Sequence, residues 1–594
     1  MAKWFIAAKK ADFHAVAEKY HIDPVIARII RNRDVITDSE IDRYLNGTLE
    51  DLPNPCLMKD LEKAADILCE KIAQKKKIRI IGDYDVDGIC STYILYKGFL
   101  VLGAQADTVI PHRIRDGYGL NEQLINDAIE EEIDTIVTCD NGIAAANVIL
   151  HAKEKGLTCI VTDHHEVPYE ETEDGRRCYM IPSADAVVDP KQEDCTYPFQ
   201  TICGAVVALK LIEVLFSKCR ITETIRHTTL QELTELAGIA TVCDVMELKD
   251  ENRILVKTAL RYMKDSANFG LKALIKVNDI MPEHLSAYHL GFVIGPCMNA
   301  TGRLDTAQMA LELLKSKTFE EAVTLAVQLK ELNNSRKEMT RLGVEEACAK
   351  VESGEYGQDK ILVLYLPDIH ESLAGIVAGR VREKYGKPTF VLTKGEDGVK
   401  GSARSIDSYH IYDEMTKCKE LFTKYGGHKM AAGLSMPEEN VAVFRKKINE
   451  ICTLTEEDFE EKILIDVPMP MSYVNLPFVK QLAILEPFGT GNEKPVFAQK
   501  AISFVQGRRM GNGNMAKFLV RDENMHQYTM LLFRGLDAFE TYVSDKFGKE
   551  ALQYLFSDSG SNNPKEIKMD VLYYPSINEY RGKQNLQFVL QGYQ

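Results

Sequence analysis

Short, nearly continuous runs of Ile and Val alternate with helical patterns between residues 78 and 188. The runs cover residues 78–81, 107–111, 135–139, 158–162 and 186–188. Apolar strands of this length, separated by helices, are typical of a parallel sheet that is covered on both faces. In such sheets ligands bind beyond the carboxyl ends of the strands. We therefore predict an α/β domain whose functional residues lie at one edge of its sheet.

The pattern changes several times along the chain, so we expect several domains. Residues 1–58 form an N-terminal segment of short helical patterns, and the α/β domain with the parallel sheet covers 59–260. A helical connector spans 261–355 and a second α/β domain spans 356–458. Strand signals dominate 459–594, and their spacing predicts a small β-barrel.

Composition narrows the classes of function. The chain has 594 residues, and 72 Lys and Arg against 88 Asp and Glu give a formal net charge of −16. A protein that coats DNA with its whole surface is usually basic, so nucleic acid would have to contact a local basic groove or bound cations. The 14 cysteines contain no C-x-x-C pair, which disfavours zinc ribbons and indicates a reducing compartment. Because the sequence shows no signal-peptide core and no apolar run of membrane length, we expect a cytoplasmic protein.

Acidic residues follow four of the five predicted strands. Asp85 and Asp87 follow the first strand, Asp140 the third, Asp163 the fourth and Asp189 the fifth. A single aspartate after a strand is often only a helix N-cap. Several carboxylates at one edge of a sheet would repel one another, and cations are the natural remedy.

Two histidines add nitrogen ligands to this set. His164 and His165 directly follow Asp163 at the end of an apolar strand. A mixed shell of carboxylates and imidazoles favours Mn²⁺ or Mg²⁺, and two such ions would activate a water and hold a phosphoryl group. An EF-hand calcium loop is excluded, because a strand precedes the acidic residues and Ile94 stands at the twelfth loop position, where Glu is needed.

These stretches resemble a known superfamily. Asp85–Gly88, Asp140–Gly142, Asp163–His165 and Gly238–Met246 are similar to the four motifs of DHH phosphoesterases, and Gly426–Gly433 is similar to the glycine-rich motif of their companion DHHA1 domain. Within the superfamily the chain most resembles the RecJ family of bacterial single-strand exonucleases. The resemblance implies a DHH domain, a helical connector, a DHHA1 domain and an OB-like β domain in the regions given above. It runs from about residue 60 to 540 and includes residues 111–120, 299–304, 370–380 and 487–497.

The resemblance implies a catalytic site with two divalent cations, Mn²⁺ or Mg²⁺. Asp163 is expected to orient the histidines, and Asp189 to have a structural role. Many DHH proteins have a metal-binding His four residues before the equivalent of Asp85, where this chain has Ile81, so Asp83 is a candidate to complete one metal site. The implied catalytic and metal-binding residues are Asp85, Asp87, Asp140, His164, His165 and Asp244.

Four arginines and a serine are expected to bind the DNA strand at its 5′ end and along its backbone. Ser402 and Arg404, with Arg113, resemble a pocket for the 5′-terminal phosphate, which would fix the polarity of degradation. The alternative for Ser402 and Arg404 is an ordinary solvated strand. Arg303 and Arg380 are expected to contact the backbone of the strand, and for Arg380 a surface helical charge is the alternative.

Glycines and a histidine complete the expected phosphate contacts. Gly427 allows close approach of the backbone to a phosphate, and His428 is expected to donate a hydrogen bond to it. The alternative is a tight turn before a helix at 430–434. In the β region, Arg508–Arg509 and Lys517–Phe518 offer positive charge and a stacking ring for single strands, or are simply exposed strand residues.

The implied function is a metal-dependent exonuclease that degrades single-stranded DNA 5′→3′ to 5′-mononucleotides during recombination and repair. One alternative is a DHH phosphodiesterase of nanoRNA or cyclic dinucleotides, which the roughly 130 residues after Lys462 argue against. Another is a single-strand-binding scaffold without catalysis, which the intact acidic and histidine motifs argue against. We expect a monomer without membrane contact that binds single-stranded DNA, with a helicase and a single-strand-binding protein as candidate partners.

Overall fold

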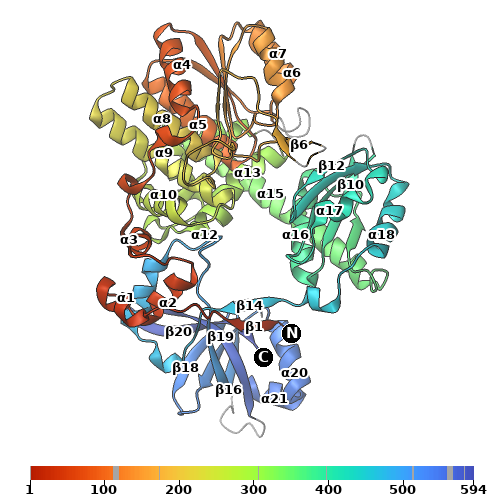
Figure 1. Ribbon diagram of the computed structural model, residues 1–594. Helices are drawn as coiled ribbons and strands as arrows, with labels where there is room; N and C mark the ends of the chain where they lie inside the picture. Colours follow the sequence, from red (N-terminus) through yellow and green to blue (C-terminus); the bar gives the residue numbers. More distant parts are fainter. Residues whose placement is uncertain are drawn as a thin grey trace. The chain divides into compact units, whose positions relative to one another are not determined.

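The computed structural model divides the chain into two compact units (Figure 1). The larger unit spans Gly47–Phe459, and the smaller unit combines Met1–Asn46 with Glu460–Gln594. The structure describes residues 2–111, 119–172, 174, 176–304, 307–395, 398–511, 514–557, 566–580 and 582–594.

The larger unit begins with a five-stranded sheet in which every neighbouring pair is parallel. This confirms the predicted parallel α/β fold. The observed strands lie within two residues of the predicted runs. In sheet order they are β3 (Gln105–Val109), β2 (Lys77–Ile81), β4 (Thr135–Cys139), β5 (Thr158–Thr162) and β8 (Ala186–Val188).

Alternate side chains of these strands pack into two separate cores. Ile80 and Val137 belong to one core, and their neighbours Ile81 and Ile136 belong to the other. Burial on both faces explains why the strands are apolar throughout instead of alternating. The first core includes α4 (Leu61–Ala73), α5 (Val86–Val101), α8 (Gly204–Lys218) and α9 (Glu223–Cys243), and the second includes α6 (Glu122–Glu130) and α7 (Ala146–Glu154).

A helical region follows, as the periodicity predicts. Its longest element is α15 (Phe319–Glu352), whose 34 residues correspond to a length of about 50 Å. The π-helical turn η5 (Leu290–Ile294) leads directly into α13 (Gly295–Leu304). The other helices of this region are α10 (Asp250–Tyr262), α11 (Phe269–Val277), α12 (Ala287–His289) and α14 (Gln308–Lys315).

The second sheet of the larger unit is mostly antiparallel, and only β9 and β10 run parallel to each other. Residues 430–434, for which a helix was the alternative, lie largely in a strand instead, because Ala432, Leu434 and Met436 are buried with the period of two that a sheet requires. In order, the strands are β12 (Lys424–Gly427), β13 (Ala431–Met436), β11 (Gly398–Arg404), β10 (Thr389–Gly395) and β9 (Leu362–Tyr365). The helices are α16 (Ala374–Tyr385), α17 (Ile411–Thr416) and α18 (Asn440–Glu450).

The smaller unit contains the predicted β-barrel. Strands β16, β17, β18, β20 and β19 pair in that order, and β16 pairs again with β19, which closes the barrel. Phe504, Phe518 and Phe539 pack together inside it. The strands are β15 (Val467–Pro468), β16 (Phe497–Met510), β17 (Met515–Arg521), β18 (Gln527–Leu532), β19 (Ile567–Tyr580) and β20 (Lys583–Tyr593), and the helices are α19 (Leu476–Leu482), α20 (Leu536–Phe547) and α21 (Lys549–Leu555).

The N-terminal segment joins this barrel. Helices α1 (Phe13–Tyr20), α2 (Pro24–Asn32) and α3 (Asp38–Asn46) form as predicted, but strand β1 (Lys3–Ile6) was not predicted. It pairs in parallel with β14 (Lys462–Ile465). The buried Arg33 Nη1 lies 2.8 Å from Asp466 Oδ1, and α2 contributes to the barrel core. Among the described helices of the chain, none is long and apolar enough to cross a membrane.

Candidate metal centre and phosphate site

The first two aspartates are fixed by the backbone of two helices. Asp85 caps α5, and its Oδ1 accepts hydrogen bonds from the amides of Asp87 (2.9 Å) and Gly88 (3.1 Å). Asp87 is buried, and its two carboxylate oxygens accept the amides of Gly204 (2.7 Å) and Ala205 (2.8 Å) at the start of α8. Because these amides hold the side chains in place, both carboxylates are oriented without a cation.

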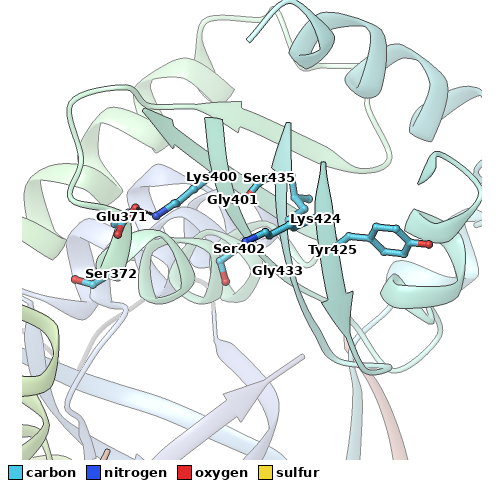
Figure 2. A pocket seen from close by; sticks show the side chains of 10 residues that line it. Glu371, Ser372, Lys400, Gly401, Ser402, Lys424, Tyr425, Gly433 and Ser435 are labelled. Carbon is cyan, nitrogen blue, oxygen red and sulfur yellow. Dashed lines mark ion pairs between the residues drawn. The ribbon is translucent and has the colours of Figure 1, made fainter. Parts of the chain in front are cut away.

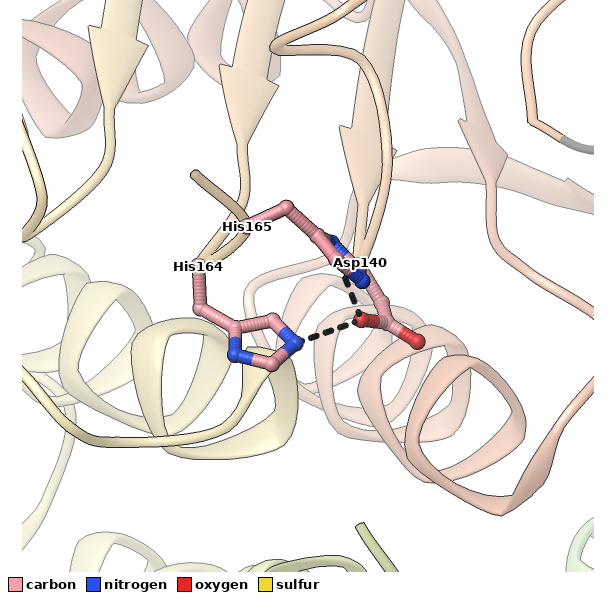
Figure 3. Close-up of side chains that lie close together, drawn as sticks. All are labelled: Asp140, His164 and His165. Carbon is pink, nitrogen blue, oxygen red and sulfur yellow. Dashed lines mark hydrogen bonds and ion pairs between the residues drawn. The ribbon is translucent and has the colours of Figure 1, made fainter. Parts of the chain in front are cut away.

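Two further strand ends bring a carboxylate and two imidazoles together (Figure 3). Asp140 follows β4 with a positive φ of 59°, and its Oδ1 lies 3.0 Å from His164 Nε2. His164 Nε2 is also 3.5 Å from Asp87 Oδ2 and 3.7 Å from Asp244 Oδ2, at the end of α9. His165 Nδ1 is 3.9 Å from Asp140 Oδ1. Residues from four separate segments therefore meet around His164 and Asp140.

The cluster contains three overlapping groups of three residues each. Within each group, the possible ligand atoms lie within 4.8 Å of one another. Asp140 belongs to two of these groups and His164 to two, so neighbouring ions would share ligands. Asp83, the candidate to replace a His at Ile81, is one member. The groups are Asp140, His164 and His165; Asp87, His164 and Asp244; and Asp83, Asp85 and Asp140.

Burial and mutual repulsion make the cluster costly when it is fully ionised. Burial, and then the charges of Asp87 and Asp85, raise the pKa of Asp140 well above its usual value, and the same causes raise the pKa of Asp244 to about 8. Burial also raises the pKa of Asp87. Asp244 Oδ2 and His164 Nδ1 are buried without a hydrogen-bond partner in the described structure. This donor set therefore fits divalent cations, which would neutralise the acids and use the free Asp244 Oδ2.

Asp163 holds the backbone of both histidines and the ring of His165. Its Oδ1 accepts from the amides of His164 (2.8 Å) and His165 (3.2 Å) and lies 2.8 Å from His165 Nδ1. Burial opposes the protonated form of His165, but the hydrogen bond to Asp163 and its charge outweigh burial and raise the pKa of His165 to about 9. Asp189 lies outside the three groups, and burial, with the charge of Asp163, raises its pKa to about 7.

Ser402 and Arg404 lie on one face of β11, next to the start of α16. Arg404 Nη1 donates to Ser402 Oγ at 3.2 Å. Gly375 permits this arrangement, because a Cβ at that position would lie 2.9 Å from both Ser402 Oγ and Arg404 Nη2. A hydroxyl, a guanidinium and the first turn of a helix thus converge, which is the set of donors that binds a phosphate.

A pocket of about 420 Å³ adjoins Ser402 on the second sheet (Figure 2). Lys400 pairs with Glu371 at 2.8 Å on one side of it, and Lys424 and Tyr425 line it from β12. The sequence did not predict a role for Lys400, Lys424 or Tyr425. These basic and aromatic residues are separated in the sequence and form no motif, and only strand pairing brings them together.

The remaining predicted residues have different surroundings. Gly427 ends β12, and the His428 amide donates to the carbonyl of Ala431 at 2.8 Å. Arg380 is exposed on α16 and lies 3.2 Å from Glu383, which are the surroundings of a surface helical charge. Arg303 lies in α13 with a side chain outside the described part of the structure, and Arg113 lies outside the described residues.

Three domain models match the chain in order. The DHH family N-terminal domain matches residues 77–241, the DHHA1 domain 358–454 and the RecJ OB domain 465–592. The single-stranded-DNA-specific exonuclease RecJ of Haemophilus influenzae is 31% identical over 589 residues, covering 96% of this chain and 95% of that protein. The chain belongs to the RecJ family. Family membership and the order of DHH, DHHA1 and OB folds are therefore confirmed.

Other RecJ proteins extend this relationship. The Bacillus subtilis RecJ is 34% identical over 529 residues, covering 88% of this chain and 64% of that protein, so the chain spans less than two thirds of its length. The crystal structure of Thermus thermophilus RecJ with Mn²⁺ has a TM-score of 0.80 and 26% identity, covering 100% of this chain and 79% of that chain. The structure of the same protein with Mg²⁺ has a TM-score of 0.74 and 25% identity, covering 100% and 78%.

Proposed function

We propose that this chain is a metal-dependent exonuclease that hydrolyses single-stranded DNA 5′→3′ to 5′-mononucleotides in recombination and repair. The observation that carries the proposal is the convergence of carboxylates and imidazoles on Asp140 and His164 at the carboxyl edge of the first sheet. Membership in a family whose relatives are named single-stranded-DNA-specific exonucleases supports it.

Six residues would hold two Mn²⁺ or Mg²⁺ ions, with Asp83 as a further oxygen ligand. When bound, such ions lower the pKa of a water and neutralise the non-bridging oxygens of a phosphate. The protein's part is to fix the ligands: helix amides hold Asp85 and Asp87, and Asp163 holds His165. His164 has a pKa lowered chiefly by burial, so it stays neutral and able to ligate near neutral pH. The six residues are Asp85, Asp87, Asp140, His164, His165 and Asp244.

The phosphate site of the second sheet would select the 5′ end. Ser402 and Arg404 would bind the terminal phosphate by a hydroxyl and a two-pronged guanidinium, with the start of α16 adding backbone donors. Arg113 and His428 would add contacts, Gly427 would let the backbone approach, and Arg303 and Arg380 would bind the following backbone. Holding the terminal phosphate in place would set the direction of degradation.

The setting of this activity follows from its substrate. Single-stranded DNA is the proposed partner, and a helicase and a single-strand-binding protein are candidates to supply and protect the strand. We place the enzyme in the cytoplasm, where bacterial DNA lies, as a monomer.

A time course on 5′-phosphorylated and 5′-hydroxyl single strands, with and without Mn²⁺, tests the proposal. We expect Mn²⁺-dependent release of mononucleotides that is faster for the 5′-phosphorylated strand. Strands from two to thirty nucleotides should be included, because activity limited to the shortest would favour a phosphodiesterase of nanoRNA. Binding of strands without any hydrolysis in Mn²⁺ or Mg²⁺ would favour the scaffold alternative.

A further inference from the structure

A small notch lies beside the metal cluster, next to two of its proposed ligands. It has a volume of about 100 Å³. Its lining includes Val86, between Asp85 and Asp87, and Cys243, directly before Asp244, together with Asn299 and Arg336. A pocket for a whole small molecule usually has about 300–1,000 Å³, so this notch is the size of a single chemical group.

Close packing fixes the helices that line the notch. The π-helical turn η5 passes so near the end of α9 that a Cβ at Gly295 would lie 2.3 Å from Cys243 Sγ and 2.9 Å from the Leu290 carbonyl oxygen. Only glycine fits this crossing. A π-helical turn is rare in proteins and is frequently found at functional sites. The notch is therefore a built feature of the fold, rigidly joined to the helix that ends at Asp244.

Arg336 of α15 enters the notch without an acidic partner. Its Nε and Nη2 donate to Asn333 Oδ1 at 3.1 and 2.9 Å, and Asn333 is held in turn by Cys297 of α13 at 3.4 Å. In the described structure no carboxylate oxygen lies within 4.0 Å of this guanidinium, whereas the buried guanidinium of Arg79 pairs with both Asp107 and Glu131. The pKa of Arg336 is lowered by burial and then by the charge of Arg380.

Arg336 is half-buried, and a cation partly withdrawn from water without a counter-charge is costly; a second cation nearby adds to the cost. An anion in the notch would supply the missing counter-charge and would also reduce the repulsion between the two arginines. The guanidinium edge that Asn333 leaves unused matches a phosphate, whose oxygens accept two parallel hydrogen bonds. Asn299 Oδ1 is buried there without a hydrogen-bond partner among the described residues, so the notch holds a second polar group that a ligand or its water could use.

We propose that Arg336 binds a backbone phosphate of the DNA strand in this notch, one linkage away from the bond that is cut. This inference rests on the proposed function and adds a substrate-binding residue to it. Arg336 would hold the strand against the metal cluster while Ser402 and Arg404 hold its end. The notch is too small for a base, so the contact reads charge and not sequence.

The test compares Arg336→Gln with Arg341→Gln on strands that carry one neutral methylphosphonate linkage at a defined position. Arg341 lies on the same helix but is exposed and paired with Glu338 and Glu345, so its variant is the matched control. We expect Arg336→Gln to raise KM for the normal strand by about 10- to 100-fold, the usual effect of a charged hydrogen bond. One neutral linkage at the bound position should slow degradation by the wild type and by Arg341→Gln. Arg336→Gln should degrade the neutral and the normal strand at the same rate.

Direct binding gives a readout that does not depend on hydrolysis. In a salt titration, Arg336→Gln should reduce the dependence of log affinity on log salt by about 0.7, the value for one phosphate contact of a single strand. Arg336→Lys, which keeps the charge and the side-chain volume, replaces Arg336→Gln if the latter does not fold, and should lose at least half of the linkage penalty. The proposal is overturned if the variants keep the full penalty at every linkage. A wild type that binds but never cleaves would instead overturn the proposed function.

Discussion

The two five-stranded sheets of the larger unit present their functional side chains in different ways. In the first sheet all strands are parallel, and most of the acidic residues lie just after the carboxyl ends of the strands, with Asp244 added from the end of α9. In the second sheet most pairs are antiparallel, and Ser402 and Arg404 lie on the face of β11 itself. A parallel sheet gathers its strand ends at one edge, so sequence position alone locates the site, whereas a face site also depends on which strands are neighbours.

The two sites also differ in how much free energy is needed to bury their charges. The candidate metal cluster consists mostly of buried carboxylates. Removing one carboxylate or a bound cation would therefore disturb the charge balance of all the others. The proposed phosphate site consists of a guanidinium and a hydroxyl that are only half-buried and would bind a single group. We therefore expect changes in the first site to have far larger effects than changes in the second.

The largest effect is expected for Asp140→Ala. Asp140 belongs to two of the three ligand groups, so its loss should reduce Mn²⁺-dependent degradation by about a thousandfold or more while the fold remains intact. Rates on a 5′-phosphorylated strand and thermal unfolding are the measurements. Asp189→Asn is the control, because Asp189 is buried at the same edge but outside the groups, and it should stay within a few-fold of the wild type. Equal losses in both variants would contradict the metal assignment.

A smaller and more selective effect is expected for Arg404→Gln. Loss of the guanidinium should reduce the preference for a 5′-phosphate over a 5′-hydroxyl by a factor of about 10 to 100, which is the effect of one charge-assisted contact. Mn²⁺ affinity should not change, since Arg404 lies on the second sheet. Lys417→Gln, an exposed residue paired with Glu414, serves as the control. A parallel fall for both kinds of 5′ end would mean that Arg404 does not bind the terminal phosphate.

Metal binding should release protons and strengthen as pH rises. The pKa of His165 is raised to about 9 and that of Asp244 to about 8, so both groups are largely protonated at neutral pH in the metal-free protein. A cation must displace these protons, so the affinity for Mn²⁺ or Mg²⁺ should increase from pH 6.5 to 8.5. Calorimetry in buffers with different ionisation enthalpies counts the protons. The same number released at both pH values, or none, would show that these groups do not ligate.

The smallest effects are expected for two glycines of α16. A methyl group at Gly375 would displace Ser402 Oγ and Arg404 Nη2, so Gly375→Ala should weaken the 5′-phosphate preference by several-fold. At Gly379 the nearest atom would be Arg404 Cγ at 3.9 Å, so Gly379→Ala should leave activity unchanged and stabilise the helix by about 0.5–1 kcal/mol. Competition between 5′-phosphorylated and 5′-hydroxyl strands, with thermal unfolding, separates the two outcomes.

Sequence reasoning was most successful where the signal is local. The strands that end near Asp85, Asp140 and His164 are continuous apolar runs, so their parallel pairing and the edge site could be inferred. It failed where long-range contacts decide. Strand β1 is only four residues long and forms because β14 offers an edge, and Arg336 has no motif because its environment comes from several separate helices.

Strand β1 also has a consequence for how the protein is made. Lys3–Ile6 leaves the ribosome long before its partner Lys462–Ile465, which is synthesised more than four hundred residues later. At about 5–20 residues per second, this delay is roughly half a minute to a minute and a half. During that time the whole segment Gly47–Phe459 can emerge and fold as a unit of its own. Lys3–Ile6 must wait unpaired, with Phe5 and Ile6 available to chaperones, until β14 arrives to pair with it.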